Sequence, residues 1–163
     1  MAVYVTNGTT ARKHELTGYG MFMAYKSTGT QTLSHNTQTV IQYDTEERDQ
    51  QGWYNTSTYK YTPQLQGWYQ IYASSYGYNF HNQGAEYATK ILKNGINIAY
   101  NLSGVECNGG ALAKHVSSII YLNGSSDYVQ GAAYQYNTGS TNDNIHGGTI
   151  RNTCFWGYLV EAT

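Results

Sequence analysis

The segment Gln66–Ala73 constrains the fold of this chain most, because it predicts a β-strand with large apolar side chains on both faces. Glycine stands near its start and aromatic and β-branched residues follow, which is the composition of a strand. Successive side chains of a strand alternate between its two faces. One face carries Tyr69, Ile71 and Ala73. The opposite face carries Trp68 and Tyr72, with Gln70 between them. A strand of an isolated two-layer sandwich normally has one polar face, so the second face needs a cover, either a loop or a neighbouring subunit.

The composition agrees with an all-β chain. The length of 163 residues suits one domain, and eighteen Tyr and eighteen Gly against a single Pro suit short strands joined by tight turns. No stretch has apolar residues at helical spacing with suitable caps. Asn94-Gly95, between two apolar alternations, is a strong hairpin signal. We therefore predict an all-β fold.

Six residues fall at a distinctive spacing. They are Tyr43, Asp49, Tyr54, Tyr61, Gly67 and Tyr69. This spacing resembles the signature of the C1q-like globular domain, in which aromatic residues flank an Asn or Asp and end at Gly-x-Tyr. Met21–Tyr25 and Phe155–Val160 are similar to the family's opening and closing strands, and the resemblance spans about residues 18–162.

The resemblance implies a jelly-roll sandwich of about ten strands over residues 18–163, related to the tumour necrosis factor (TNF) fold. It implies a homotrimer that binds or builds structure, and not an enzyme. Ile119–Leu122 and Asp127–Gln130 are expected to form a further hairpin after the one at Asn94-Gly95. The predicted trimer interface consists of four aromatic residues, Trp68, Tyr72, Trp156 and Tyr158.

Residues 1–17 are predicted to be an N-terminal arm, polar except for Val3, Tyr4 and Val5. The arm is either a flexible terminus or a strap that orders on a partner. In the second case, Val3, Tyr4 and Val5 would add an edge strand to that partner. The first residues also lack the basic and apolar regions of a secretory signal.

The charge pattern argues against several classes of partner. The formal net charge is −1 and charged residues make up 12% of the chain, so nucleic acid and an anionic membrane are not indicated. No apolar run approaches the roughly 20 residues of a membrane span. We expect no nucleic-acid binding and no membrane insertion.

The sequence predicts no catalytic residue, metal ligand or cofactor. The five His are scattered, without metal-binding spacing. The acidic cluster Asp44, Glu46, Glu47 and Asp49 is a solvated loop or, less favoured, a calcium site of the kind found in some C1q-like proteins. Gly147-Gly148 lacks the Lys and the Ser or Thr of a phosphate loop. Cys107 and Cys154 are either bridged or two free thiols, with free thiols favoured.

Two functions follow from the resemblance. The first is a phage virion structural protein, made in the host cytoplasm and exposed on the virion surface as a capsid decoration protein or a fibre head, with other virion proteins as partners. The second is a soluble recognition module for a host surface glycan or receptor. Its predicted contact residues lie in the loop 74–81 and are Tyr76, Tyr78, Phe80 and His81. Aromatic faces and amides suit sugar rings. A polysaccharide-degrading enzyme is least favoured.

Overall fold

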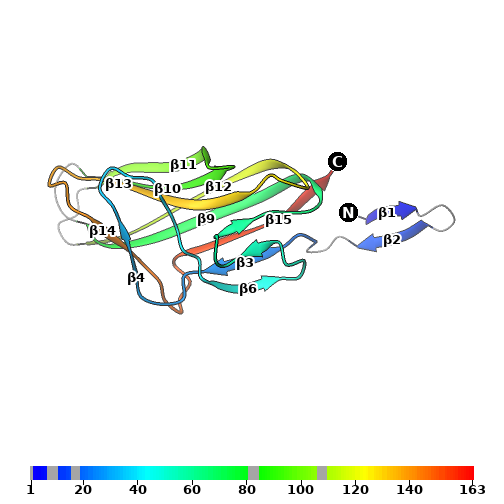
Figure 1. Cartoon of the computed structure of the whole chain (residues 1–163), viewed down its shortest axis with the longest axis horizontal. Coiled ribbons are helices and arrows are strands. Elements are labelled where there is room, and N and C mark those ends of the chain that lie inside the picture. The colour runs from blue at the N-terminus through cyan, green and yellow to red at the C-terminus, as the bar shows by residue number, and fades with distance from the viewer. Residues whose placement is uncertain (1, 7–10, 16–18, 81–84, 106–109) are drawn as a thin grey trace.

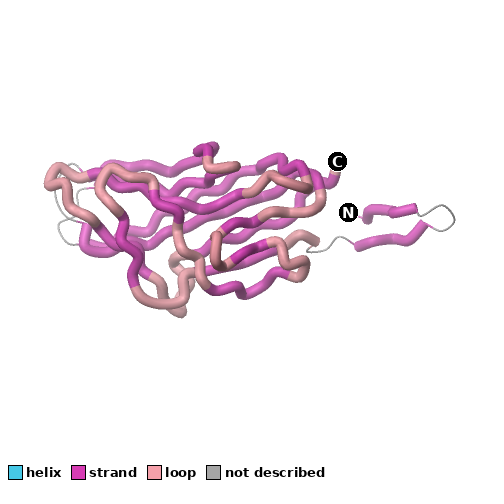
Figure 2. The backbone as a smooth tube through the Cα atoms, viewed as in Figure 1, coloured by secondary structure: helices cyan, strands magenta, loops and turns pink. Residues whose placement is uncertain are grey.

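The computed structural model describes residues 2–6, 11–15, 19–80, 85–105 and 110–163. These residues form strands, turns and loops without a helix (Figure 2), which confirms the all-β prediction. The described residues accordingly contain no helix that could span a membrane.

Two larger sheets make up most of the described chain (Figure 1). The seven-stranded sheet contains β3 (Phe22–Tyr25), β4 (Thr30–Leu33), β6 (Thr45–Asp49), β9 (Gln66–Phe80), β12 (Gly110–Asn123), β14 (Asp143–His146) and β15 (Cys154–Ala162). The six-stranded sheet contains β5 (Thr39–Val40), β7 (Tyr54–Asn55), β8 (Lys60–Tyr61), β10 (Ala85–Lys93), β11 (Ile96–Val105) and β13 (Val129–Tyr136). All strand pairings within these sheets are antiparallel. The predicted jelly-roll sandwich is confirmed, with more strands than the expected ten because three of them are only two residues long.

The strand β9 is the centre of the seven-stranded sheet. Along one edge it pairs with β12 from Gln66 to Phe80. Along the other edge it pairs first with β15 and then with β14. The last strand of the chain, β15, lies between β9 and the early strand β3.

The signature residues lie in the core between the sheets. Tyr43, Tyr61 and Tyr69 are fully buried and Tyr54 nearly so. Each donates its hydroxyl hydrogen to a backbone carbonyl, at Ser74 (3.0 Å), Gly20 (2.6 Å), Leu65 (2.7 Å) and Tyr43 (2.8 Å) respectively. Buried polar groups need such partners. The spacing of the aromatic residues in the sequence therefore marks positions in the core, where each tyrosine hydroxyl has a hydrogen-bond partner.

Gly67 opens β9 at a close approach to β15. A Cβ at this position would meet the carbonyl oxygen of Glu161 and lie 2.8 Å from Leu159 Cδ1. The structure thus gives a steric reason for the glycine of the Gly-x-Tyr element.

The hairpin predicted at Asn94-Gly95 is confirmed. β10 and β11 pair across it, and both turn residues have positive φ, 52° and 80°. The hairpin predicted from Ile119–Leu122 and Asp127–Gln130 is wrong, because β12 pairs with β9 whereas β13 pairs with β10 in the other sheet.

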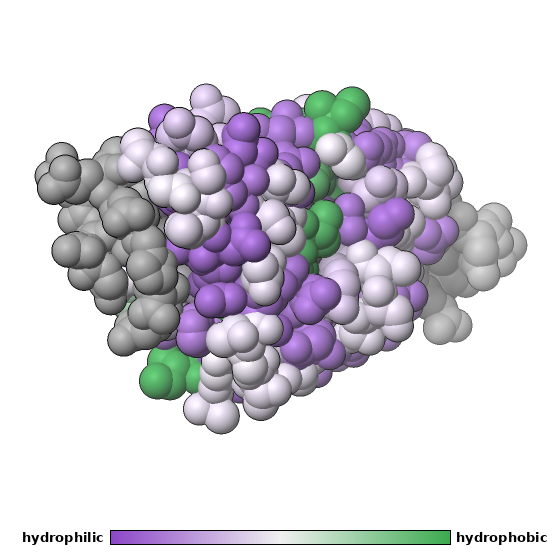
Figure 3. Space-filling view, turned by 60° about the vertical axis from the view of Figure 1, so that its left-hand side comes forward, coloured by the Kyte–Doolittle hydropathy of each residue, from purple (hydrophilic) through white to green (hydrophobic). Residues whose placement is uncertain are grey.

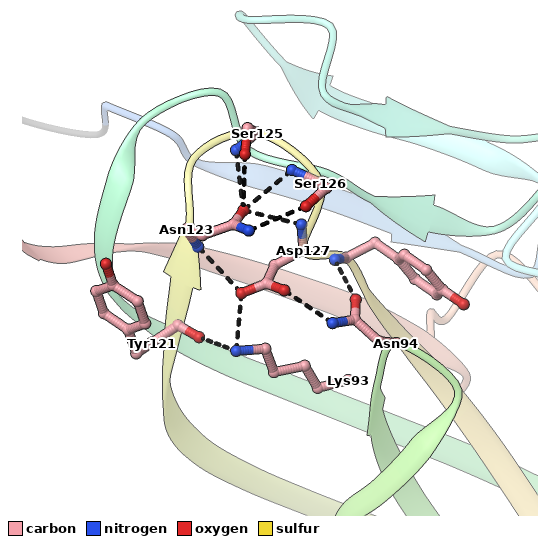
Figure 4. A network of polar contacts seen from close by, with 8 residues as sticks. Lys93, Asn94, Tyr121, Asn123, Ser125, Ser126 and Asp127 are labelled. Atoms are coloured by element: carbon pink, nitrogen blue, oxygen red, sulfur yellow. Dashed lines mark hydrogen bonds and ion pairs between the residues drawn. The ribbon is translucent and has the colours of Figure 1, made fainter.

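The connection from β12 to β13 crosses between the sheets and is held by polar side chains (Figure 4). Asn123 Oδ1 accepts hydrogen bonds from the backbone N–H groups of Ser125, Ser126 and Asp127 at 2.9 to 3.0 Å. The Asp127 carboxylate binds Lys93 Nζ at 2.8 Å and Asn94 Nδ2 at 2.8 Å. The network therefore ties this crossing to the β10–β11 turn.

The N-terminal segment forms its own two-stranded sheet from β1 (Ala2–Thr6) and β2 (Ala11–Glu15). Val3, Tyr4 and Val5 pair with residues of β2. Within the described residues, β1 has no other strand partner, so its outer edge stays unpaired. The role of residues 1–17 as an attachment arm remains a prediction.

Candidate functional site

Aromatic side chains cover the outer face of β9 and of two of its neighbours, β12 and β15. The rings of Tyr72 and Trp156 stack, with centroids 4.9 Å apart and planes 12° apart. Trp156 stacks in turn on Tyr158, at 6.2 Å and 6°. This arrangement follows from the antiparallel register, which places Trp156 opposite Tyr72. Together with Trp68, the four predicted interface residues lie on the outer side of two adjacent strands.

The third strand, β12, contributes residues that the sequence analysis did not select. Tyr121 meets Trp68 edge to face, with ring centroids 5.6 Å apart. His115 stacks on Tyr72 at 5.8 Å. The alternation of side chains along residues 115–121 indicated a strand that could carry them. The register of β12 on β9, which places them beside Trp68 and Tyr72, could not be predicted from the neighbouring sequence. We call the six residues Trp68, Tyr72, His115, Tyr121, Trp156 and Tyr158 the aromatic face.

The aromatic face is accessible although its members are large. Trp68 is 42% exposed, and Tyr121 and Tyr158 are exposed as well. Ile119 and Val160, on β12 and β15, are further exposed apolar residues. A group of exposed apolar and aromatic side chains on one sheet face is typical of an interaction site.

A second set of exposed apolar side chains lies on β11, the edge strand of the six-stranded sheet. It consists of Ile96, Ile98, Tyr100 and Leu102, which we call the β11 row. Tyr100 and Leu102 also line a pocket of about 290 Å³ together with Ala88, Lys90, Asn97 and Tyr134. Figure 3 shows one face of the molecule, on which hydrophilic and near-neutral residues predominate and green, hydrophobic surface is limited to a few separate areas.

Side chains of the six-stranded sheet bind backbone carbonyls of β12. Thr89 Oγ1 donates to Lys114 O at 3.1 Å, Lys93 Nζ to Tyr121 O at 2.8 Å, and Asn101 Nδ2 to His115 O at 2.9 Å. These bonds join the two sheets along one side of the sandwich. They also fix the strand that carries Tyr121 and His115.

The predicted ligand-contact residues lie on a strand and not in a loop. Tyr76, Tyr78 and Phe80 belong to β9, which continues because β12 pairs with it as far as Phe80. The loop prediction was wrong because this cross-strand pairing outweighs the weak local strand preference of Ser, Gly and Asn. His81 lies outside the described residues, as do the side chains of Tyr78 and Phe80. Only the half-buried side chain of Tyr76 can therefore be placed.

Tyr76 lines a pocket between β9 and the β14–β15 loop. The pocket has a volume of about 290 Å³ and is lined by Tyr76, His146, Gly147, Gly148, Thr149, Ile150, Arg151 and Asn152, which we call the loop pocket. The rings of Tyr76 and His146 meet edge to face, 6.4 Å apart. In the sequence, Gly147-Gly148 resembled at most an incomplete phosphate loop, and this site could not be predicted because the loop reaches Tyr76 only through the tertiary fold.

The acidic cluster belongs to the edge strand β6 and the residue before it, not to a loop; Asp44, Glu46 and Glu47 are exposed, and Asp49 is half-buried. Asp44 accepts hydrogen bonds from Ser27 N (2.8 Å) and Thr45 Oγ1 (3.0 Å). Although partial burial raises the pKa of Asp44, these bonds and the charge of Lys26 hold it below its usual value. Glu47 pairs with Arg151 at 2.7 Å. Among the described residues, no three His, Cys, Asp or Glu lie close enough to hold a metal ion, so nothing there supports the calcium alternative.

Cys154 is a buried free thiol. Burial raises its pKa, and its sulfur lies 3.3 Å from Ser74 Oγ. Cys107 lies outside the described residues. The bridged alternative is therefore wrong for Cys154, and its thiol is too enclosed to suggest a reactive site.

Comparison with known proteins places the fold. No family model matches the sequence, and no curated protein matches it. Among solved structures, the globular domain of zebrafish complement 1qA superposes with a TM-score of 0.62 at 10% identity, covering 88% of this chain and 98% of that one. The Eiger TNF of S. frugiperda gives 0.62 at 9% identity, covering 88% and 93%. Murine APRIL gives 0.60 at 7% identity, covering 86% and 98%. The chain thus has the C1q/TNF-type jelly-roll fold.

Proposed function

We propose that this protein is a homotrimeric, non-enzymatic module and that the aromatic face is its subunit interface. The observation that carries the proposal is the stacked, partly exposed ring array across β12, β9 and β15. Packing the aromatic face against another subunit would bury the second apolar face of the strand Gln66–Ala73. The similarity of the fold to C1q and TNF domains adds support.

The second apolar surface favours a ring over a two-fold dimer. A closed ring of three subunits uses two different surfaces on each subunit, whereas a two-fold dimer uses one surface twice. The aromatic face and the β11 row are two such surfaces on different sheets. Each subunit would place its β11 row against the aromatic face of the next subunit, with more than about 1,000 Å² buried per pair.

Light scattering after gel filtration tests the assembly. We expect a mass three times that of the 18.2 kDa chain at micromolar concentration. The Trp68→Glu and Tyr158→Glu variants should be monomeric, because a carboxylate would be buried in the interface. Ile150→Glu is the matched control, since Ile150 is 82% exposed and lies outside the aromatic face. A wild-type monomer would refute the trimer.

The setting that we propose is the surface of a phage virion, where the trimer serves as a capsid decoration protein or a fibre head. The low charge and the Asn-, Ser-, Thr- and Tyr-rich composition support this setting. The protein would be made in the host cytoplasm and bind other virion proteins. Mass spectrometry of purified particles tests the proposal, and particles without this chain would overturn it.

A second candidate function is recognition of a saccharide or receptor. The loop pocket favours it, because it brings the predicted contact residue Tyr76 together with polar groups at a concave site. The two functions are compatible in a virion protein that contacts the host.

A further inference from the structure

The loop pocket has a rigid frame. Thr153 is buried, accepts a hydrogen bond from Tyr76 N at 3.0 Å and donates one to His146 O at 2.7 Å. One side chain behind the pocket thus fixes the backbone of both ring-bearing residues. Such preorganisation lowers the cost of ordering the site on binding.

The loop itself is held to the connection between β3 and β4 by backbone hydrogen bonds. Gly147 N donates to Gly29 O at 2.9 Å, and Gly148 N donates to Lys26 O at 3.0 Å. At Gly147 a Cβ would lie 2.6 Å from Lys26 Cγ, so glycine permits this close contact. At Gly148 a Cβ would meet nothing within 4 Å. The loop is therefore packed against Lys26 at Gly147, whereas Gly148 has open space beside it.

The polar groups of the loop pocket are nearly balanced in charge. The Arg151 guanidinium is paired with Glu47, 2.7 Å from Nε to Oε2, and lies over the ring of Tyr25. No Asp or Glu belongs to the lining. Thr149 and Asn152 add a hydroxyl and an amide, which both donate and accept hydrogen bonds. An anion would have to compete with Glu47 for the guanidinium, so a neutral ligand fits better.

A neutral pyranose ring matches this combination of groups. Its C–H face packs on an aromatic ring, and its hydroxyls pair with amide and hydroxyl groups. The volume of about 290 Å³ suits a ligand of one ring. We propose that the loop pocket binds a single neutral sugar unit of a saccharide, with Tyr76 as the stacking surface. This inference rests on the recognition function proposed above and does not require the trimer, because one chain forms the whole pocket.

The test is an NMR titration of the full chain with five probes, the methyl glycosides of glucose, galactose, mannose, N-acetylglucosamine and N-acetylgalactosamine. We expect at least one to bind with a Kd on the order of 1 mM. Tyr76→Ala should weaken that binding at least about tenfold, and Tyr76→Phe should keep it within about twofold, because the ring is retained.

A blocking variant and its matched control complete the test. Gly148→Leu should weaken binding at least about tenfold, because Gly148 lines the loop pocket and a leucine side chain there would compete with the ligand for space. Gly104→Leu is the control, since a Cβ at Gly104 also meets nothing within 4 Å but lies on β11, outside the loop pocket. The Trp68→Glu variant should bind as the wild type does, so a failed trimer and a failed sugar site give different results.

Three outcomes would overturn the inference. One is that none of the glycosides binds at about 100 mM. Another is that binding persists unchanged in both Tyr76→Ala and Gly148→Leu. The third is that glucuronate or inorganic phosphate binds at this site while the neutral glycosides do not.

Discussion

Tyr69 illustrates how one signature residue contributes to the core. It is fully buried on the inner face of β9, and its hydroxyl donates to Leu65 O at 2.7 Å. Tyr69→Ala should cost about 3–5 kcal/mol of unfolding free energy, because it leaves a large cavity. Tyr69→Phe should cost only about 1 kcal/mol, the worth of a hydrogen bond. Urea melts measure both changes, and a loss below about 1 kcal/mol for Tyr69→Ala would contradict the packing seen here.

The buried tyrosines also predict alkaline unfolding. Burial raises the pKa of Tyr43, Tyr54, Tyr61, Tyr69 and Tyr87 above the ordinary value of about 10. Since the folded pKa exceeds the unfolded one, the resulting stability is fully present below about pH 10 and is lost as the pH rises toward the folded values. Part of the phenolate absorbance should therefore appear only together with the loss of the circular dichroism signal. A single absorbance step that precedes unfolding would contradict this.

At the scale of elements, Asp127 links the β12–β13 connection to the turn between β10 and β11. Partial burial raises its pKa, but hydrogen bonds from Lys93 and Asn94 and the charge of Lys93 outweigh this and hold the pKa below its ordinary value. Its stabilisation is therefore present above about pH 4 and is lost as the pH falls through the folded pKa. Asp127→Asn should cost about 1–2 kcal/mol at neutral pH and progressively less in acid. Thermal melts across pH measure this, with the exposed Glu161→Gln as a control that should change little.

The β1–β2 hairpin leads to a prediction about attachment. Its strands pair only with each other among the described residues, so removing residues 1–17 should leave both larger sheets and the trimer intact. The unpaired edge of β1 could add to a strand of a partner. We expect the truncated protein to be incorporated into particles at a lower copy number, measured by quantitative mass spectrometry. Unchanged incorporation would exclude this role of the arm.

What could be predicted from sequence depended on whether the signal was local. The inner face of β9 and the turn at Asn94-Gly95 follow from side-chain period and turn chemistry, and both were predicted. The path of the chain after β12 could not be predicted, because a turn signal does not tell whether the next strand stays in the same sheet. Trp68 and Tyr72 were predicted from the alternation within β9 itself. His115 and Tyr121 were missed, because they join the aromatic face only through the register of β12 on β9. The loop pocket likewise joins β9 to residues about 70 positions later in the chain.

At the scale of the whole molecule, a trimer links stability to concentration. Mass action stabilises a folded subunit that binds its partners. The Tm of the wild type should therefore rise with protein concentration, whereas that of the monomeric Trp68→Glu variant should not. Calorimetry over a hundredfold range of concentration, about 1 to 100 µM, measures the difference. A Tm independent of concentration in both proteins would count against an assembly that stabilises the fold.

The position of β15 between β9 and β3 sets the order of events during synthesis. The seven-stranded sheet cannot close until Cys154–Ala162 have left the ribosome, since they supply the strand between two strands made much earlier. Until then the nascent chain exposes two strand edges and the apolar faces beside them, a state open to chaperones and to mispairing. This sheet is thus expected to finish folding only after β15 has left the ribosome, and a nascent chain stalled before β15 should remain sensitive to protease.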